Sequence, residues 1–202
     1  MNIKNFSMRW ATRSVRPAAV AGMALAALGV SACGSGDARE GQASSYLIVD
    51  RLVMADSGGA PFESDVVSDD GTFEDGAVAT LSAAMRDVTN PNEPTTNNLI
   101  TLNRYRVEFR RSDGRKEPGV DVPYGFDGAV TATVAPGESV TVPFVMVRIQ
   151  AKLEAPLAAL RFHGGALAIS TIADVTFYGR DQAGREVAVT GSTSVNFADW
   201  AG

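Results

Sequence analysis

The two side chains with the most reactive chemistry occur once each in the chain. Cys33 is the only cysteine and His163 the only histidine among the 202 residues. A single cysteine allows no internal disulfide and cannot supply the several thiolates of a structural zinc site. Its thiol can still act as a nucleophile that accepts a covalent group. His163 could be a general base or a metal ligand, but there is no Gly-x-Ser-x-Gly motif, and we expect a loop histidine.

The residues before Cys33 follow the order of an export signal. Residues 1–32 contain Lys4, Arg9, Arg13 and Arg16 and no acidic residue, and residues 18–30 carry no charge. A basic start followed by a short apolar run is typical of a secretory signal peptide. The run is too short for a membrane-spanning helix, which needs about 20 residues.

Val30, Ser31, Ala32 and Cys33 place one aliphatic and two small residues before the cysteine. This stretch resembles the lipobox of bacterial lipoproteins. The resemblance implies a diacylglycerol thioether on Cys33, cleavage after Ala32, and acylation of the new amino group, for instance by palmitate. Several acyl chains anchor a protein stably, whereas one chain binds weakly. Gly34 stands where aspartate would signal inner-membrane retention, which favours the outer membrane in a diderm. The alternative is an ordinary signal peptide with a chance cysteine.

The rest of the chain is acidic. Four of the 18 basic residues lie in residues 1–32 and all 23 acidic residues follow, so the remainder has a net charge of −9 with His163 neutral. Such a domain repels nucleic acid and anionic lipid headgroups. We therefore expect no nucleic-acid partner and no membrane contact other than the lipid on Cys33.

Acidic residues gather in one short segment, which contains Glu63, Asp65, Asp69, Asp70, Glu74 and Asp75. Oxygen-rich loops of this kind can hold calcium, and Asp69, Asp70, Glu74 and Asp75 are the candidate ligands. The spacing does not match an EF-hand, and a solvated acidic loop is the simpler interpretation. Two of the chain's carboxylates could instead form a glycoside-hydrolase pair, which spacing in sequence cannot test.

Basic residues gather later in the chain, at Arg104, Arg106, Arg110, Arg111, Arg115 and Lys116. They could meet an anionic partner such as a phosphorylated glycan, but we favour an edge strand that charge protects from aggregation. Residues 119–128 follow, with Pro123, Tyr124 and Phe126 among glycines. This segment could contact a ligand, although a packed loop is the favoured interpretation.

Period-two alternation and turn residues predict the elements that position these side chains. Strands are expected over residues 46–54, 64–67, 77–88, 103–111, 130–134, 139–152, 167–178 and 186–197. Residues 77–88 also show helical spacing, and Pro143 indicates an edge strand or a bulge. A short helix is expected over 154–161, where Pro156 suits the first turn.

The expected fold is all-β: an immunoglobulin-like antiparallel β-sandwich of about seven or eight strands with one short helix, preceded by an N-terminal signal helix. The expected organisation is a signal peptide (1–32), a lipidated cysteine with a flexible tether (33–45) and the sandwich (46–200). The domain resembles a set of uncharacterised envelope lipoproteins in four segments: SYLIVDRL (45–52), GVDVPYGFDGAV (119–130), QAKLEAPLAAL (150–160) and DVTFYGRDQAGREV (174–187). That resemblance implies no known activity.

These observations predict a lipid-anchored cell-envelope protein with a non-enzymatic binding or structural domain and no cofactor. Its partner would be another envelope protein or a glycan. The alternatives are an exported hydrolase and a calcium-stabilised adhesion module.

Overall fold

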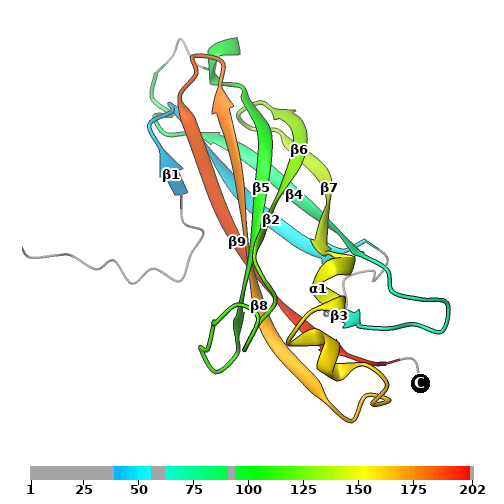
Figure 1. Ribbon diagram of the computed structural model, residues 1–202. Coiled ribbons are helices and arrows are strands. Elements are labelled where there is room, and N and C mark those ends of the chain that lie inside the picture. The colour runs from blue at the N-terminus through cyan, green and yellow to red at the C-terminus, as the bar shows by residue number, and fades with distance from the viewer. Residues whose placement is uncertain (1–38, 56–61, 91–93, 201–202) are drawn as a thin grey trace, which may run out of the picture. The chain divides into compact units, whose positions relative to one another are not determined.

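The computed structural model describes residues 39–55, 62–90 and 94–200, which form an all-β sandwich of two sheets (Figure 1). The predicted signal helix and the box residues Val30, Ser31, Ala32 and Cys33 lie outside the described residues. No helix in the described part of the chain is long and apolar enough to cross a membrane.

The larger sheet has six strands in the order β1–β9–β8–β5–β6, with β3 also paired to β9. The bounds are β1 Arg39–Gly41, β3 Phe62–Asp65, β5 Ile100–Arg111, β6 Phe126–Val134, β8 Ala168–Asp181 and β9 Glu186–Ala198. The smaller sheet has the order β2–β4–β7, with β2 Ser45–Met54, β4 Asp75–Met85 and β7 Ser139–Val147. The β3–β9 pair is parallel and the other strand pairs are antiparallel.

The seven long strands have an immunoglobulin-like arrangement, which confirms the predicted fold class. The first, second and fifth of them (β2, β4, β7) form one sheet, and the third, sixth and seventh (β5, β8, β9) belong to the other. The fourth, β6, pairs with β5, whereas in the constant-type immunoglobulin domain the fourth strand joins the first sheet. The protein is therefore a β-sandwich in which the fourth long strand, β6, belongs to the sheet of β5 instead of the sheet of β2 and β4.

A cluster of four rings joins the sheets at the centre of the core. Tyr105 packs against Phe126, Phe144 and Phe177 with ring centroids 5.2–6.4 Å apart. The Tyr105 hydroxyl accepts a hydrogen bond of 3.2 Å from the backbone N–H of Val145 in the opposite sheet. The ring of Tyr105 lies so close to β6 that a Cβ on Gly128 would come within 2.2 Å of it. Aromatic packing of this kind supplies much of the apolar burial in a core that has no disulfide.

The folded part of the chain begins earlier than predicted. Residues 39–41 pair with Val187–Val189 of β9, Ala43 is buried, and the hydroxyl of buried Ser45 donates to the backbone oxygen of Asn98. The predicted tether over 33–45 is therefore wrong from residue 39 onward. Gly41, one of the glycines that indicated a flexible segment, instead allows a close approach to β9, where a Cβ would lie 2.2 Å from the backbone oxygen of Glu186.

The strand predicted over residues 77–88 is confirmed as far as Met85, where β4 ends, and Ala77, Ala79, Leu81 and Ala83 are buried at every second position. The prediction of an edge strand at Pro143 is also confirmed, because β7 is the outer strand of the smaller sheet.

The predicted helix over 154–161 is wrong in its position. The chain instead leaves β7 after Val147 and forms α1 at Ile149–Leu153, and a 3-10 turn, η2, follows at Leu157–Leu160. A second 3-10 turn, η1, lies at Thr96–Asn98. Glu154 has an extended backbone, with φ −112° and ψ 163°, and α1 ends before it.

Candidate functional site

Three loops and the end of β9 lie in the lower half of Figure 1, with the β3–β4 loop at the right, the β5–β6 loop at the left and the β7–β8 connection between them. We name residues 66–74, 112–125, 148–167 and 199–200 the loop end. Hydrogen bonds hold its parts: the backbone N–H groups of His163 and Gly164 donate to Asp199 Oδ2 at 3.0 and 3.3 Å, and the Trp200 N–H donates to Asp65 Oδ1 of the adjoining β3 at 3.1 Å. The loop end thus has defined internal contacts and can present side chains in fixed positions.

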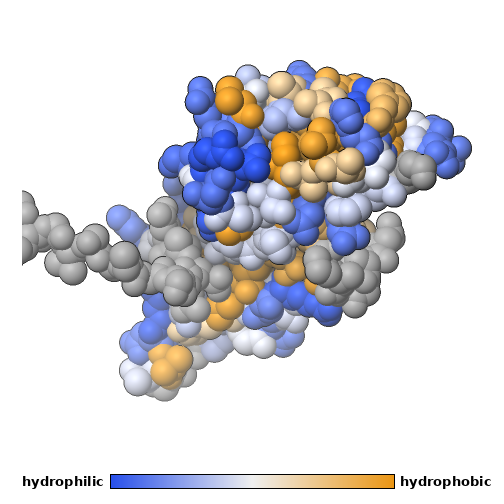
Figure 2. Space-filling view, turned by 90° about the horizontal axis from the view of Figure 1, so that it is seen from below, coloured by the Kyte–Doolittle hydropathy of each residue, from blue (hydrophilic) through white to orange (hydrophobic). Residues whose placement is uncertain are grey.

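Most exposed apolar side chains of the protein are found at this end. Nine large apolar side chains of the described residues are exposed, and eight of them belong to the loop end. These eight are Phe73, Val120, Tyr124, Ile149, Leu153, Phe162, Leu167 and Trp200, and the ninth is Val88 between β4 and β5. Figure 2, which views the molecule from below, shows apolar residues gathered over part of this end. Such a concentration differs from the scattered apolar residues of an ordinary surface.

The basic residues of β5 lie on the outer face of the larger sheet and are paired with carboxylates. Asp127 accepts from Arg104 at 3.1 Å and from Arg106 at 2.8 Å, and Arg106 also pairs with Glu108 at 3.0 Å. The hydrogen bond with Glu108, followed by the charges of Glu108 and Asp127, raises the pKa of Arg106. Arg110 pairs with Asp174 at 3.0 Å. The outer face is therefore charge-balanced and not a cationic patch.

The predicted edge position of this strand is wrong, because β5 lies between β8 and β6. Alternation of residue types along a strand shows which side chains share a face, but it does not show how many neighbours the strand has. Here the charged face is accounted for by ion pairs to the adjacent strands, as expected for cross-strand neighbours.

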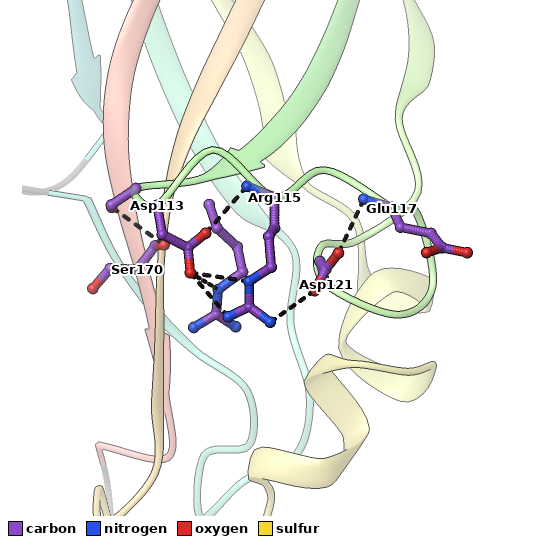
Figure 3. A network of polar contacts seen from close by, with 7 residues as sticks. Asp113, Arg115, Glu117, Asp121 and Ser170 are labelled. Atoms are coloured by element: carbon purple, nitrogen blue, oxygen red, sulfur yellow. Dashed lines mark hydrogen bonds and ion pairs between the residues drawn. The ribbon is translucent and has the colours of Figure 1, made fainter.

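The remaining basic residues belong to a polar network in the β5–β6 loop (Figure 3). The guanidinium of Arg115 donates to Asp113 Oδ2 at 2.9 and 3.0 Å and to Asp121 Oδ1 at 3.2 Å. Asp121 also accepts from the backbone N–H of Glu117, and Arg111 pairs with Asp113 at 3.7 Å. The hydrogen bond from Arg115 lowers the pKa of the Asp113 carboxyl. These contacts hold the loop in one conformation. Lys116 is the basic residue of the loop that forms no ion pair with another described residue.

The aromatic segment 119–128 is partly core and partly surface. Pro123 and Phe126 are buried, as the favoured packing interpretation predicted. Tyr124 is 57% exposed, and its hydroxyl oxygen would lie only 2.4 Å from a Cβ added to Gly119. Gly119 has a φ of +77°, which a residue with a side chain adopts only with strain. The glycine thus fixes Tyr124 against the loop with much of its ring in solvent.

The six clustered carboxylates do not converge on a common point. Asp75 bonds Lys152, while Asp65 accepts from the Ser68 hydroxyl and from Trp200. Across residues 39–55, 62–90 and 94–200 there is no group of three or more His, Cys, Asp or Glu side chains that could hold a metal ion. Asp69, Asp70, Glu74 and Asp75, the candidate calcium ligands, thus form no such group.

A buried ion pair between Lys152 of α1 and Asp75 of β4 was not predicted from the residue pattern. The Lys152 side chain is 2% exposed, and its Nζ lies 2.7 Å from Asp75 Oδ1. Burial raises the pKa of the Asp75 carboxyl, against the opposing effect of the hydrogen bond and charge of Lys152. The other oxygen, Oδ2, and the buried hydroxyl of Ser64 have no hydrogen-bond partner within the described residues. The pair ties α1 to the smaller sheet, with Lys152 closed to solvent and the Asp75 side chain 15% exposed.

His163 is exposed in the loop after η2, in agreement with its interpretation as a loop histidine. Its backbone N–H and that of Gly164 donate to Asp199 Oδ2 at 3.0 and 3.3 Å. Asp199 is 3% exposed. Its role was not predicted from the sequence, because no residue pattern shows that an aspartate after a strand will accept hydrogen bonds from a distant loop. Through this contact the C-terminal end of β9 holds the loop that carries Phe162 and His163.

Comparisons with protein-family models, with curated proteins and with solved structures found no match. The interpretation of this surface therefore rests on its own residues.

Proposed function

We propose that this chain is a lipid-anchored cell-envelope protein whose sandwich is a non-enzymatic binding module that meets its partner through the loop end. The observation that carries the binding role is the position of the exposed apolar side chains, eight of nine of which lie there. Protein contact surfaces are rich in aromatic residues at their centre, and Phe73, Tyr124, Phe162 and Trp200 supply such residues here.

The outer face of the larger sheet supports the same assignment by contrast. Its arginines are neutralised by Asp127, Glu108 and Asp174, so that face offers a solvated, charge-balanced surface. Exposed ion pairs of this kind contribute little free energy and mainly keep a surface soluble. The loop end is where exposed apolar side chains concentrate.

The anchor is supported by the basic leader, the apolar run and the Val30–Cys33 box. Cys33 and the first residue of β1, Arg39, are six positions apart, and an extended chain of that length spans roughly 20 Å. The module would then work close to the membrane surface, on the outer membrane if the organism is a diderm. An envelope protein is the partner that such a location favours.

The anchor is tested by intact mass and membrane partition of the full chain expressed in a bacterium, next to Cys33→Ser. We expect the wild type in the membrane fraction, with a mass that starts at Cys33 and includes acyl groups, and the variant in the soluble fraction. Ser35→Ala, which leaves the box intact, is the matched control and should behave like the wild type. If both wild type and Cys33→Ser are soluble and cut at another position, the anchor is wrong.

A further inference from the structure

A hollow of about 520 Å³ lies in the loop end between the β3–β4 loop and the loop after η2. Its lining includes Val67, Asp69 and Gly71 from the first loop and Phe162 and Gly164 from the second. Asp199 at the end of β9 completes it, and this carboxylate already bonds the second loop. The hollow is thus formed by three segments whose positions are tied to one another.

Three exposed aromatic rings belong to this hollow and its immediate neighbours. Phe162 lines it and is 80% exposed, while Phe73 is 55% exposed, with its ring tip 3.9 Å from a Cβ placed on Gly71. Trp200, the next residue after Asp199, is 48% exposed. The guanidinium of Arg161 lies 5.3 Å from the ring centre of Phe162. Aromatic rings at such positions can hold a cation against their faces.

Apart from Arg161, whose guanidinium lies over Phe162, the charged residues beside these rings are carboxylates without ion pairs, so negative charge exceeds positive charge here. Asp69, which lines the hollow, and its neighbours Asp70 and Glu74 are exposed, and none of them forms an ion pair with another described residue. The arginines of β5 and of the β5–β6 loop, in contrast, are matched by carboxylates. The loop end therefore combines an apolar hollow with uncompensated negative charge on one side.

We propose that this hollow receives a cationic, apolar segment of a partner protein, in which a lysine or arginine meets the carboxylates and an apolar side chain meets Phe162. The inference rests on the proposed function and names the chemistry of the partner. Charge complementarity decides the occupant: free carboxylates attract a basic protein segment and repel an anionic lipid surface or a nucleic acid. A second copy of the chain would bring the same carboxylates against one another in a symmetric contact.

The probe is a short amphipathic peptide of alternating Leu and Lys, with an alternating Leu–Glu peptide as its counterpart. Residues 36–202 form one compact unit with its own core, so this part can be used without the anchor. Trp10 and Trp200 are the only tryptophans of the chain, so Trp200 alone reports from this part. We expect the Leu–Lys peptide to change Trp200 emission with saturation, and the Leu–Glu peptide to have no effect.

Substitutions locate the binding. Asp69→Asn and Asp70→Asn should each weaken it several-fold, and Phe162→Ala about tenfold. Glu138→Gln and Val88→Ala remove one exposed charge and one exposed apolar side chain at the opposite end, and each should change affinity less than twofold. Circular dichroism and melting temperature show whether each variant is folded.

Four results would overturn the proposal. They are equal binding of both peptides, equal loss in Glu138→Gln and Asp69→Asn, a Trp200 response to phosphatidylcholine vesicles alone, and concentration-dependent self-association in sedimentation. The last two would identify a lipid surface or a second copy as the occupant. Because the tested part lacks Cys33, its failure does not affect the anchor experiment, and a failed anchor experiment does not affect this one.

Discussion

At the scale of single residues, Lys152 shows how one buried charge determines the position of a connection. It joins α1 to Asp75 at the start of β4, at 2.7 Å and with almost no solvent contact. Removing charges from water costs several kcal/mol, so a buried pair adds little to stability as a whole, but removing one partner is costly. The pair therefore fixes where the β7–β8 connection lies more than it stabilises the fold.

We expect Lys152→Met to lower the free energy of unfolding by about 3–5 kcal/mol at neutral pH, since it leaves Asp75 buried without its cation. The double variant Lys152→Met/Asp75→Leu should be close to wild type. Urea denaturation of the single and double variants measures both values. A double variant no more stable than Lys152→Met would contradict this account.

The pH dependence has a defined sign. Burial raises the pKa of Asp75 above its ordinary value of 3.8, so its contribution to stability is present below that value and is lost as pH rises through the folded-state pKa. Lys152→Met removes the hydrogen bond and charge that oppose this rise. The stability gap between wild type and variant should thus be small near pH 4 and grow toward pH 7, as parallel urea curves would show.

At the scale of elements, the edge of β9 depends on two short strands. β1 covers Val187–Val189 and β3 covers Val195–Ala198, each by pairing of three or four residues. Gly41 at the end of β1 has a φ of +128°, and a Cβ there would lie 2.2 Å from the backbone oxygen of Glu186. No other residue type fits this approach without moving β1.

Gly41→Ala should therefore detach β1 while the rest of the sandwich stays folded. We expect hydrogen exchange to rise about tenfold or more in residues 187–189 and to stay unchanged in β5 and β8. Gly137→Ala is a control at another glycine of positive φ, whose added Cβ would meet nothing within 4 Å. Protection of residues 187–189 equal to wild type would show that β1 does not depend on Gly41.

Period-two alternation sufficed to predict β5, β8 and β9, because one face of each strand is buried and the other is polar. It did not place α1, since the apolar run of β7 continues into residues 149–153 without a capping signal. It also could not show that β5 has two neighbours. The Lys152–Asp75 pair joins residues 77 positions apart, and the hollow at Phe162 depends on three segments that only the fold brings together.

At the scale of the whole molecule, the surface is divided by chemistry. The outer face of the larger sheet carries arginines and carboxylates in pairs, whereas the loop end carries the exposed apolar side chains and free carboxylates. A net charge of −9 after residue 32 keeps such a protein in solution and favours a basic partner. In the proposed function, a lipid on Cys33 holds this surface near the membrane and its partner.

We propose the loop end as the contact surface of an envelope-anchored module. The most direct measurement places a photoreactive phenylalanine analogue at Leu153, in the loop end, or at Val88, at the opposite end, of the full chain in intact cells. We expect one discrete adduct from Leu153, with a mass that differs from that of two copies of the chain and with loss of the adduct in Asp69→Asn/Asp70→Asn, and no adduct from Val88. Equal adducts from both positions, or none from Leu153, would contradict it.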